Sequence, residues 1–198
     1  MIILGITGGI GSGKSTVCEI LRLHHIPVYD ADKEAKKLND TSSVIRKELI
    51  AIFGETLYND NKLNRRQLAA HIFNNKNNLQ QVNKIIHTEL AKHFKAWTAN
   101  KKSHPVVAID AAVLFEAGFQ NYVDQTITVT APREVRMERV MKRDQMSEEQ
   151  IEARMASQMS EEEKINLSDF TITNDGNHSI IQQIELILKT IENSRKLV

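Results

Sequence analysis

Short apolar runs alternate along the chain with longer stretches of helical periodicity. Five runs rich in apolar and β-branched residues predict strands: Ile2–Thr7, Ile26–Tyr29, Pro105–Asp110, Gln125–Thr130 and Phe170–Thr173. Helical patterns separate these runs, which is typical of parallel strands joined by right-handed crossovers. The pattern therefore predicts an α/β fold built on a five-stranded parallel sheet.

The segment between the second and third predicted strands is too long for a single crossover. It runs from about Asp32 to His104 and is strongly helical. Apolar residues recur along it every three or four positions and form one face: Val82, Ile86, Leu90, Phe94 and Trp97. We interpret it as a helical insertion that carries a substrate pocket, and the alternative is an extension with no binding role. The asparagine-rich stretch 74–78 is interpreted as a loop between helices.

A second helical segment separates the last two predicted strands. One helix is predicted from Pro132 to Arg143, and Ser147…Gln150 and Ser160…Glu163 match capping boxes that begin two more helices. A short polar turn joins the first two helices, and the pair has the form of a mobile lid. An amphipathic helix over 179–188 closes the chain.

The first predicted strand leads directly into a glycine-rich loop. Gly8–Ser15 matches the pattern G-x-x-x-x-G-K-[ST], and a helix follows it through about Leu23. Glycines let the backbone point its N–H groups at an anion, Lys14 can reach terminal phosphates, and the Ser15 hydroxyl can hold Mg²⁺. The loop therefore predicts a nucleoside triphosphate and Mg²⁺. The residues expected to bind the nucleotide are Gly9, Ile10, Gly11, Ser12, Gly13, Lys14, Ser15 and Thr16.

Other phosphate-binding classes do not match the chain. A Rossmann site is excluded because the glycines read G-x-G-x-G and a Lys-Ser pair follows them. A GTPase switch would carry Asn-Lys-x-Asp, and an ABC-type ATPase would carry Leu-Ser-Gly-Gly-Gln, and neither occurs. A kinase for another small molecule, such as a nucleotide or a sugar, is the nearest alternative.

Composition limits the setting in which the protein works. Its 198 residues correspond to one core domain with insertions, and its net charge of +1 provides no global field for nucleic acid or anionic membrane. The single Cys18 can form neither an internal disulfide nor a zinc cluster, and we expect a buried thiol. No signal peptide and no apolar run of roughly 18 residues is found, so we expect a cytoplasmic enzyme.

Carboxylates follow two of the predicted strands. Asp30 and Asp32 follow the second strand, and two residues apart in extended chain they would share one face. We favour Asp32 as the base that accepts a proton from the acceptor hydroxyl, with Asp30 supporting metal water or backbone. The alternative is that both residues cap the next helix. Asp110 ends the third strand and could hold Mg²⁺ through water, and Glu116 follows as a further candidate.

Basic residues gather in the first helix of the predicted lid. Arg136, Arg139 and Arg143 are three and four residues apart and share one face, with Lys142 alongside. Guanidinium groups suit phosphate oxygens, so this face is expected to bind the nucleotide, and the alternative is a solvated helix surface. Arg154 and Gln158 share a face of the next helix.

One of the seven histidines lies beside the apolar face of the helical insertion. This residue, His87, is as consistent with a buried structural histidine as with a ligand contact. The histidines show neither His-x-x-x-His nor H-E-x-x-H spacing, so no zinc site is expected.

Taken in order, these motifs resemble those of dephospho-CoA kinases. The resemblance is carried by the glycine-rich loop, Asp30-Ala31-Asp32, Val113-Leu114-Phe115-Glu116, Arg139…Arg143-Asp144 and Arg154…Gln158. It covers nearly the whole chain, including the segments Asn64-Arg65…Ile72-Phe73 and Ile85-Ile86-His87 of the insertion. The chain departs from the family pattern at Thr88 and Ala112, where proline is usual, and neither departure removes a reacting group.

The resemblance implies a function and a layout. The function is phosphorylation by ATP of the ribose 3′-hydroxyl of dephospho-CoA, a small-molecule substrate, in the last step of coenzyme A synthesis. The layout is a three-layer P-loop kinase with a core at 1–32, 104–131 and 166–198, a helical CoA-binding insertion at 33–103, and a lid at 132–165. The oligomeric state stays open.

The resemblance also implies roles for individual residues. Asp32 matches the proposed base and works with Lys14 and Arg139 in catalysis, while Arg139 and Arg143 bind ATP. The residues implied to bind the acceptor are Asp32, Arg65, His87, Leu114, Glu116 and Arg154. Ser15 and Asp110 are the expected metal ligands.

Overall fold

The chain forms two compact units. One comprises residues 1–28 and 101–198, and the other comprises residues 29–100. The computed structural model describes residues 1–73 and 75–196, the last three of them as backbone only. No helix among the described residues has the length and apolar character to cross a lipid bilayer.

A five-stranded sheet organises the chain, as the sequence predicts. Its strands are β1 (Ile2–Thr7), β2 (Val28–Asp30), β5 (Val106–Asp110), β6 (Gln125–Thr130) and β7 (Phe170–Thr173). They lie in the order β2-β5-β1-β6-β7, and β1 pairs in parallel with both β5 and β6. The loop that follows β1 therefore leaves the carboxyl end of the central strand, where open α/β sheets bind their ligands.

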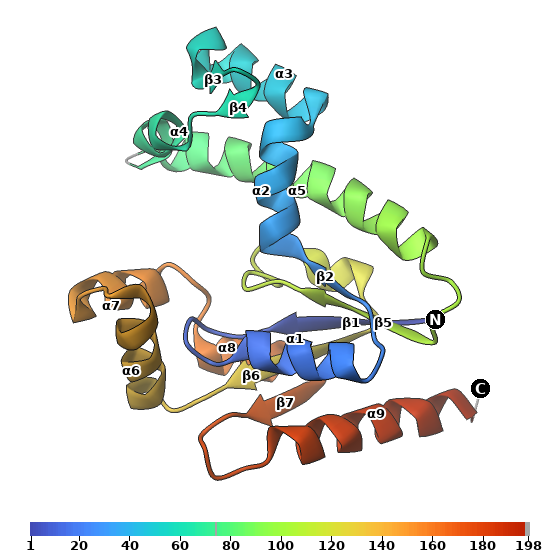
Figure 1. Ribbon diagram of the computed structural model, residues 1–198. Coiled ribbons are helices and arrows are strands. Elements are labelled where there is room, and N and C mark those ends of the chain that lie inside the picture. Colours follow the sequence, from blue (N-terminus) through green and yellow to red (C-terminus); the bar gives the residue numbers. More distant parts are fainter. Residues whose placement is uncertain (74, 197–198) are drawn as a thin grey trace. The chain divides into compact units, whose positions relative to one another are not determined.

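Two helices cover one face of this sheet. α1 (Lys14–Leu23) and α9 (Ile180–Lys196) pack on β1, β6 and β7, and α9 continues eight residues beyond the predicted end of the closing helix at Leu188 (Figure 1). Their apolar residues form one core with the strands, which includes Leu4, Ile6, Val17, Ile172 and Ile184. Because β1 is buried on both sides, it is a continuous apolar run with no alternation.

The opposite face of the sheet is covered by the segment that follows β5 and by α8 (Glu161–Leu167). The side chain of Leu114 packs over Gly5 so closely that a Cβ at Gly5 would lie 3.0 Å from Leu114 Cδ2. Leu114 and Phe119 are fully buried there. Glycine in the middle of β1 thus makes room for this layer.

The predicted lid segment forms α6 (Arg133–Asp144) and α7 (Glu148–Ala156). Both predicted capping boxes are present, at Ser147…Gln150 and at Ser160…Glu163. Gln145 ends α6 in the left-handed conformation with φ 53°, which turns the chain sharply towards α7. A small core of Met137, Val140 and Ile151 holds the two helices together.

The second unit, residues 29–100, is mostly helical. It contains α2 (Ala31–Thr41), α3 (Ser43–Phe53), α4 (Arg65–Ile72) and α5 (Lys76–Ala99), with a 3₁₀ turn over Glu55–Leu57. They enclose a core of their own: Ile45, Leu49, Leu57, Tyr58, Leu63, Leu68, Val82 and Ile85. On the predicted apolar face of α5, Val82, Leu90 and Phe94 are buried, whereas Ile86 and Trp97 are half-buried.

Two features of this unit differ from the sequence-based expectation. Lys76–Asn78 form the first turn of α5 and not a loop, because the Asn75 side chain caps the helix by accepting from the N–H of Asn78 at 3.0 Å; Asn74 lies outside the described residues. A hairpin of β3 (Tyr58–Asn59) and β4 (Lys62–Leu63) was not expected. Asp60 and Asn61, with positive φ, form its two-residue turn.

Candidate active site

The glycine-rich loop joins β1 to α1, as predicted. Gly11 and Gly13 have φ values of 81° and 91°, which favour glycine, and Gly13 caps α1. Ser12 is 1% exposed, and its hydroxyl has no hydrogen-bond partner among the described residues. A loop that ends at a helix N-terminus and encloses an unpartnered hydroxyl suits a polyphosphate.

Lys14 and Asp110 form an ion pair next to this loop. Lys14 begins α1 and Asp110 ends β5, and their side chains are 16% and 12% exposed. The acid at the end of the third predicted strand therefore lies beside the P-loop lysine. Ser15, in the first turn of α1, adds an exposed hydroxyl.

A magnesium ion fits the donors that these elements supply. Mg²⁺ prefers oxygen ligands and retains several waters, so a hydroxyl and one carboxylate beside a phosphate cradle match its chemistry. Among the described residues, no group of three or more His, Cys, Asp or Glu side chains is arranged to hold a metal ion. The protein alone therefore offers only part of a coordination shell at Ser15 and Asp110, as at other sites where phosphates complete it.

Arg139 is held against the loop by Asn174, the residue that follows β7. The guanidinium Nη2 donates to the main-chain carbonyl of Asn174 at 3.1 Å and to its side-chain oxygen at 3.2 Å. The Asn174 amide donates in turn to the Ser12 carbonyl at 2.8 Å. Asn174 was not among the predicted site residues, although its polar side chain follows the end of a predicted strand, which is a signal for the ligand crevice.

The other cations of the predicted face have different surroundings. Arg136 is buried at 9% exposed, and its Nη2 lies 2.7 Å from Glu161 Oε2. Arg143 is exposed and pairs with the neighbouring Asp144 at 2.8 Å. Lys142 pairs with Glu138 on the exposed side of α6. The structure thus brings Arg136 and Arg139 to the loop and leaves Arg143 in solvent.

The next helix also reaches the loop. Gln158, just beyond α7, accepts a hydrogen bond from the N–H of Ile10 at 3.3 Å. Arg154 lies 3.9 Å from Asp144 and is mostly exposed. The expectation that Arg154 and Gln158 share a face of one helix was wrong, because α7 ends at Ala156 and Gln158 follows it.

Glu116 is fixed by a buried lysine. Lys164 in α8 is 0% exposed, and its Nζ lies 3.0 Å from Glu116 Oε1 and donates to the Ala112 carbonyl at 2.7 Å. Glu116 also accepts from the N–H of Met159 at 2.9 Å. No sequence pattern distinguishes Lys164, because it follows three glutamates and resembles part of a solvated helix. Leu114 has no exposed surface, so in this conformation it packs in the core and offers no surface to a ligand.

In the second unit, the Asp30 and Asp32 carboxylates have separate positions. Asp30 caps α2, because its side chain accepts from the N–H of Lys33 at 2.9 Å. Asp32 lies in the first turn of that helix and is exposed. The expectation that they share one face of an extended chain was wrong, because the helix begins at Ala31.

Arg65 and His87 also belong to the second unit. Arg65 Nη2 lies 2.7 Å from Asp40 Oδ2 and donates to the Lys36 carbonyl at 3.1 Å. Burial acts to raise the pKa of Asp40, but hydrogen bonds from Arg65 and the N–H of Leu63 bring it below its usual value. His87 is half-buried, and burial lowers its pKa.

Cys18 is a buried thiol close to Asp110. Its thiol is fully buried, as the sequence predicts, and burial together with the nearby Asp110 carboxylate raises its pKa far above the usual value. A thiol that remains protonated is a poor nucleophile.

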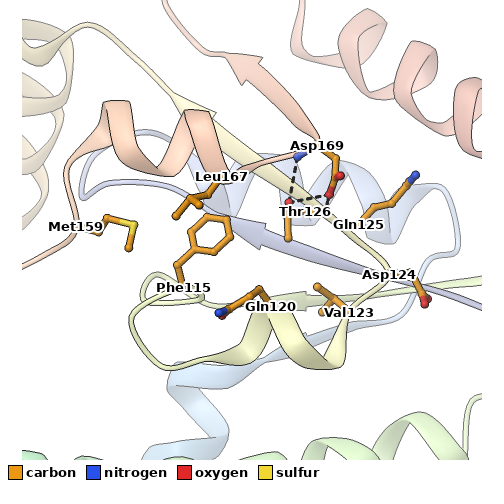
Figure 2. Close-up of a pocket in the computed structure, with 9 residues that line it drawn as sticks. All are labelled: Phe115, Gln120, Val123, Asp124, Gln125, Thr126, Met159, Leu167 and Asp169. Atoms are coloured by element: carbon orange, nitrogen blue, oxygen red, sulfur yellow. Dashed lines mark hydrogen bonds between the residues drawn. The ribbon is translucent and has the colours of Figure 1, made fainter.

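A separate cavity of about 330 Å³ lies at the amino ends of β6 and β7 (Figure 2). Its lining includes Phe115 and Leu167 together with Asp124 and Asp169, and, among the residues that the structure describes, no lysine or arginine. Thr126 donates to Asp169 Oδ2 through its N–H at 2.7 Å. An acidic and apolar cavity of this kind does not suit a phosphate.

Comparisons with known proteins identify the family. The sequence model of the dephospho-CoA kinase family matches residues 2–179. A dephospho-CoA kinase from Bacteroides fragilis is 46% identical over 185 residues, which cover 93% of this chain and 90% of the relative.

Solved structures agree with this assignment. A crystal structure of a Thermus thermophilus protein superimposes with a TM-score of 0.83 at 33% identity, and it covers 96% of this chain and 97% of that one. A dephospho-CoA kinase from Campylobacter jejuni gives a TM-score of 0.69 at 27% identity and covers 98% of both chains. The chain therefore belongs to the dephospho-CoA kinase family, the enzymes of the last step in coenzyme A synthesis.

Proposed function

We propose that this chain transfers the γ-phosphoryl group of ATP to the ribose 3′-hydroxyl of dephospho-CoA. The observation that carries the proposal is the family match over residues 2–179, within which the P-loop, its lysine and the acid that ends β5 lie together. Transfer to a hydroxyl requires a phosphate cradle, a metal, cations over the transferred group and a base.

The nucleotide end of the reaction is assigned to the first unit. The amides of Gly9–Thr16 and the Lys14 ammonium bind the phosphates, and Arg139 approaches them from its position against Asn174. Arg143 is exposed, and it reaches the nucleotide only when α6 and α7 move. We assign 132–165 to a lid whose closure excludes water, so that the phosphoryl group passes to the acceptor hydroxyl.

Magnesium would be held by the Ser15 hydroxyl and, through water, by the Asp110 carboxylate. When bound, the ion neutralises charge on the phosphates during transfer. Asp110 also pairs with Lys14, so the carboxylate orients the lysine ammonium beside the loop.

The acceptor end of the reaction is assigned to a second group of residues. Asp32 takes the proton from the 3′-hydroxyl, and its exposed place in the first turn of α2 leaves the carboxylate accessible. The residues that we assign to binding of dephospho-CoA are Arg65, His87, Leu114, Glu116 and Arg154. Leu114 requires a rearrangement to do so, because it is fully buried.

The layout of the protein follows from these roles. The core comprises 1–32, 104–131 and 166–198, and the helical insertion at 33–103 binds the acceptor. We propose that the enzyme works in the cytoplasm and that it needs neither nucleic acid nor membrane.

The experiment that tests the function is a comparison of acceptors. Purified protein is incubated with Mg-ATP and dephospho-CoA, adenosine, AMP or shikimate, and ADP release is followed. We expect release with dephospho-CoA, together with formation of a product heavier by one phosphoryl group. Lys14→Ala serves as the control for contaminating kinases. Preference for another acceptor would overturn the proposed substrate and leave the fold unaffected.

A further inference from the structure

Arg136 is a buried cation beside the glycine-rich loop, and the proposed function gives it no separate role. It lies in α6, and only 9% of its surface is exposed. Burying a guanidinium group is unfavourable unless charged or polar partners compensate it. The contacts of this side chain therefore indicate what it is placed to do.

Glu161 holds the Arg136 guanidinium from one side. Its Oε2 lies 2.7 Å from Arg136 Nη2, while its Oε1 accepts from the Thr130 hydroxyl at 2.5 Å and from the N–H of Ala131 at 3.4 Å. Both carboxylate oxygens are thus engaged, and Glu161 is fixed at the carboxyl end of β6. A cation tied to a fixed carboxylate has a defined position.

The loop is shaped around Arg136 from the other side. A Cβ at Gly9 would lie 2.6 Å from Arg136 Nη1, and a Cβ at Gly11 would lie 2.5 Å from the Arg136 main-chain oxygen. Any larger residue at either position would displace Arg136 or the loop. Gly9 therefore lets the guanidinium of Arg136, and Gly11 its main chain, approach the backbone that we propose cradles the phosphates.

The Nε donor of Arg136 is left for another group. This atom is buried and has no hydrogen-bond partner among the described residues, although leaving a buried donor without a partner is unfavourable. Arg136 also lines a cavity of about 210 Å³ together with Gly9, Gln158 and Glu161. A fixed guanidinium with an unused donor, next to a phosphate cradle, matches a phosphate oxygen.

We propose that Arg136 is a further catalytic residue, which binds the terminal phosphate of the nucleotide while Glu161 positions its guanidinium. This inference rests on the proposed function, because it takes ATP as the ligand of the loop. It predicts that Arg136 distinguishes ATP from ADP, since ADP lacks the group that it contacts. If Arg136 only joined α6 to α8 through Glu161, its replacement would not affect ATP and ADP binding differently.

The test compares the affinities for ATP and ADP of wild type and Arg136→Gln by calorimetry in the absence of acceptor. We expect ATP to bind at least about tenfold more weakly to the variant, as for the loss of a charged hydrogen bond, while the affinity for ADP stays within about twofold. Lys142→Gln removes the same charge from the exposed side of the same helix and should change neither affinity.

Two further variants separate binding from folding. Arg136→Lys keeps the positive charge beside Glu161 but lacks the planar set of guanidinium donors. We expect its affinity for ATP to lie between those of wild type and Arg136→Gln, with its affinity for ADP unchanged. If Arg136→Gln fails to fold, the ATP and ADP affinities of Arg136→Lys test the proposal. Glu161→Gln should also lower the affinity for ATP more than the affinity for ADP, because the Arg136 guanidinium loses the carboxylate that positions it.

An equal loss of affinity for both nucleotides, or no loss for either, would overturn the role of Arg136. Such a result is distinguishable from failure of the proposed function, because wild type would still phosphorylate dephospho-CoA. Absence of dephospho-CoA turnover by wild type would instead refute the substrate and leave the ratio of ATP to ADP affinities as a separate result.

Discussion

The Lys14 ammonium and the Asp110 carboxylate form an ion pair that joins the start of α1 to the end of β5. The pair is mostly shielded from solvent, so each group lies close to its partner in a medium less polar than water. Lys14 is therefore fixed before nucleotide binds. An ammonium that is already oriented towards the cradle needs little rearrangement to act on a phosphate.

Replacement of Lys14 tests this arrangement. Lys14→Ala should lower kcat for dephospho-CoA phosphorylation by roughly 100-fold or more, the size of effect expected when a preorganised donor is removed from a developing charge. Steady-state ADP release measures the effect. Lys142→Ala removes an exposed lysine that pairs with Glu138, and it should leave kcat unchanged. Retention of most activity by Lys14→Ala would contradict the role of the lysine.

Asp32 and Asp30 offer a matched pair for the assignment of the base. Asp32→Asn should leave ATP affinity largely intact and lower kcat by about 100-fold or more, within the range expected for loss of a general base. Asp30→Asn should retain activity, because asparagine caps a helix about as well as aspartate. Calorimetry with ATP and turnover with dephospho-CoA measure the two effects. Near-wild-type turnover of Asp32→Asn would show that another group is the base.

The sheet and the P-loop could be predicted because local patterns determine them. Ile2–Thr7 is a buried strand with a continuous apolar run, and the glycines that follow it have a fixed spacing to Lys14. The order of the strands could not be read in this way. Which strand lies next to β1 depends on contacts between residues about a hundred positions apart.

The individual site residues were less predictable, because their roles depend on what surrounds them. Arg136, Arg139 and Arg143 look equivalent on a helical face, but their surroundings differ. Arg136 is buried and pairs with Glu161, and Arg139 donates to Asn174. Arg143 is exposed and pairs with Asp144. Lys164 is the clearest miss. Its burial results from packing against Ala112 and Glu116, and no local pattern reports this.

Replacement of Gly13 tests how closely the loop approaches Asn174. Gly13→Ala places a Cβ 2.0 Å from Asn174 Nδ2 at a φ of 91°, so it should be destabilising through both backbone strain and collision. Gly176→Ala has a similar φ of 89° but nothing within 4 Å, and only backbone strain of about 1–2 kcal/mol should appear. Chemical denaturation of both variants isolates the contribution of the collision. Equal losses would mean that Asn174 moves aside at no cost.

The pH dependence of stability should reveal the burial of His87. Burial lowers its pKa below the ordinary value of 6.5, so the unfolded chain takes up a proton more readily than the folded protein. The contribution of His87 to the free energy of unfolding should therefore be fully present above about pH 6.5 and decrease as the pH falls towards the lowered value. Urea unfolding between pH 5 and 7.5, compared for wild type and His87→Gln, measures this contribution as the difference between two curves. The free energy of unfolding of His87→Gln should change less with pH than that of wild type, because the variant lacks the imidazole that takes up a proton on unfolding. Carboxylates titrate mainly below this pH range. Two parallel curves would show that the imidazole takes up a proton equally well in the folded and unfolded states.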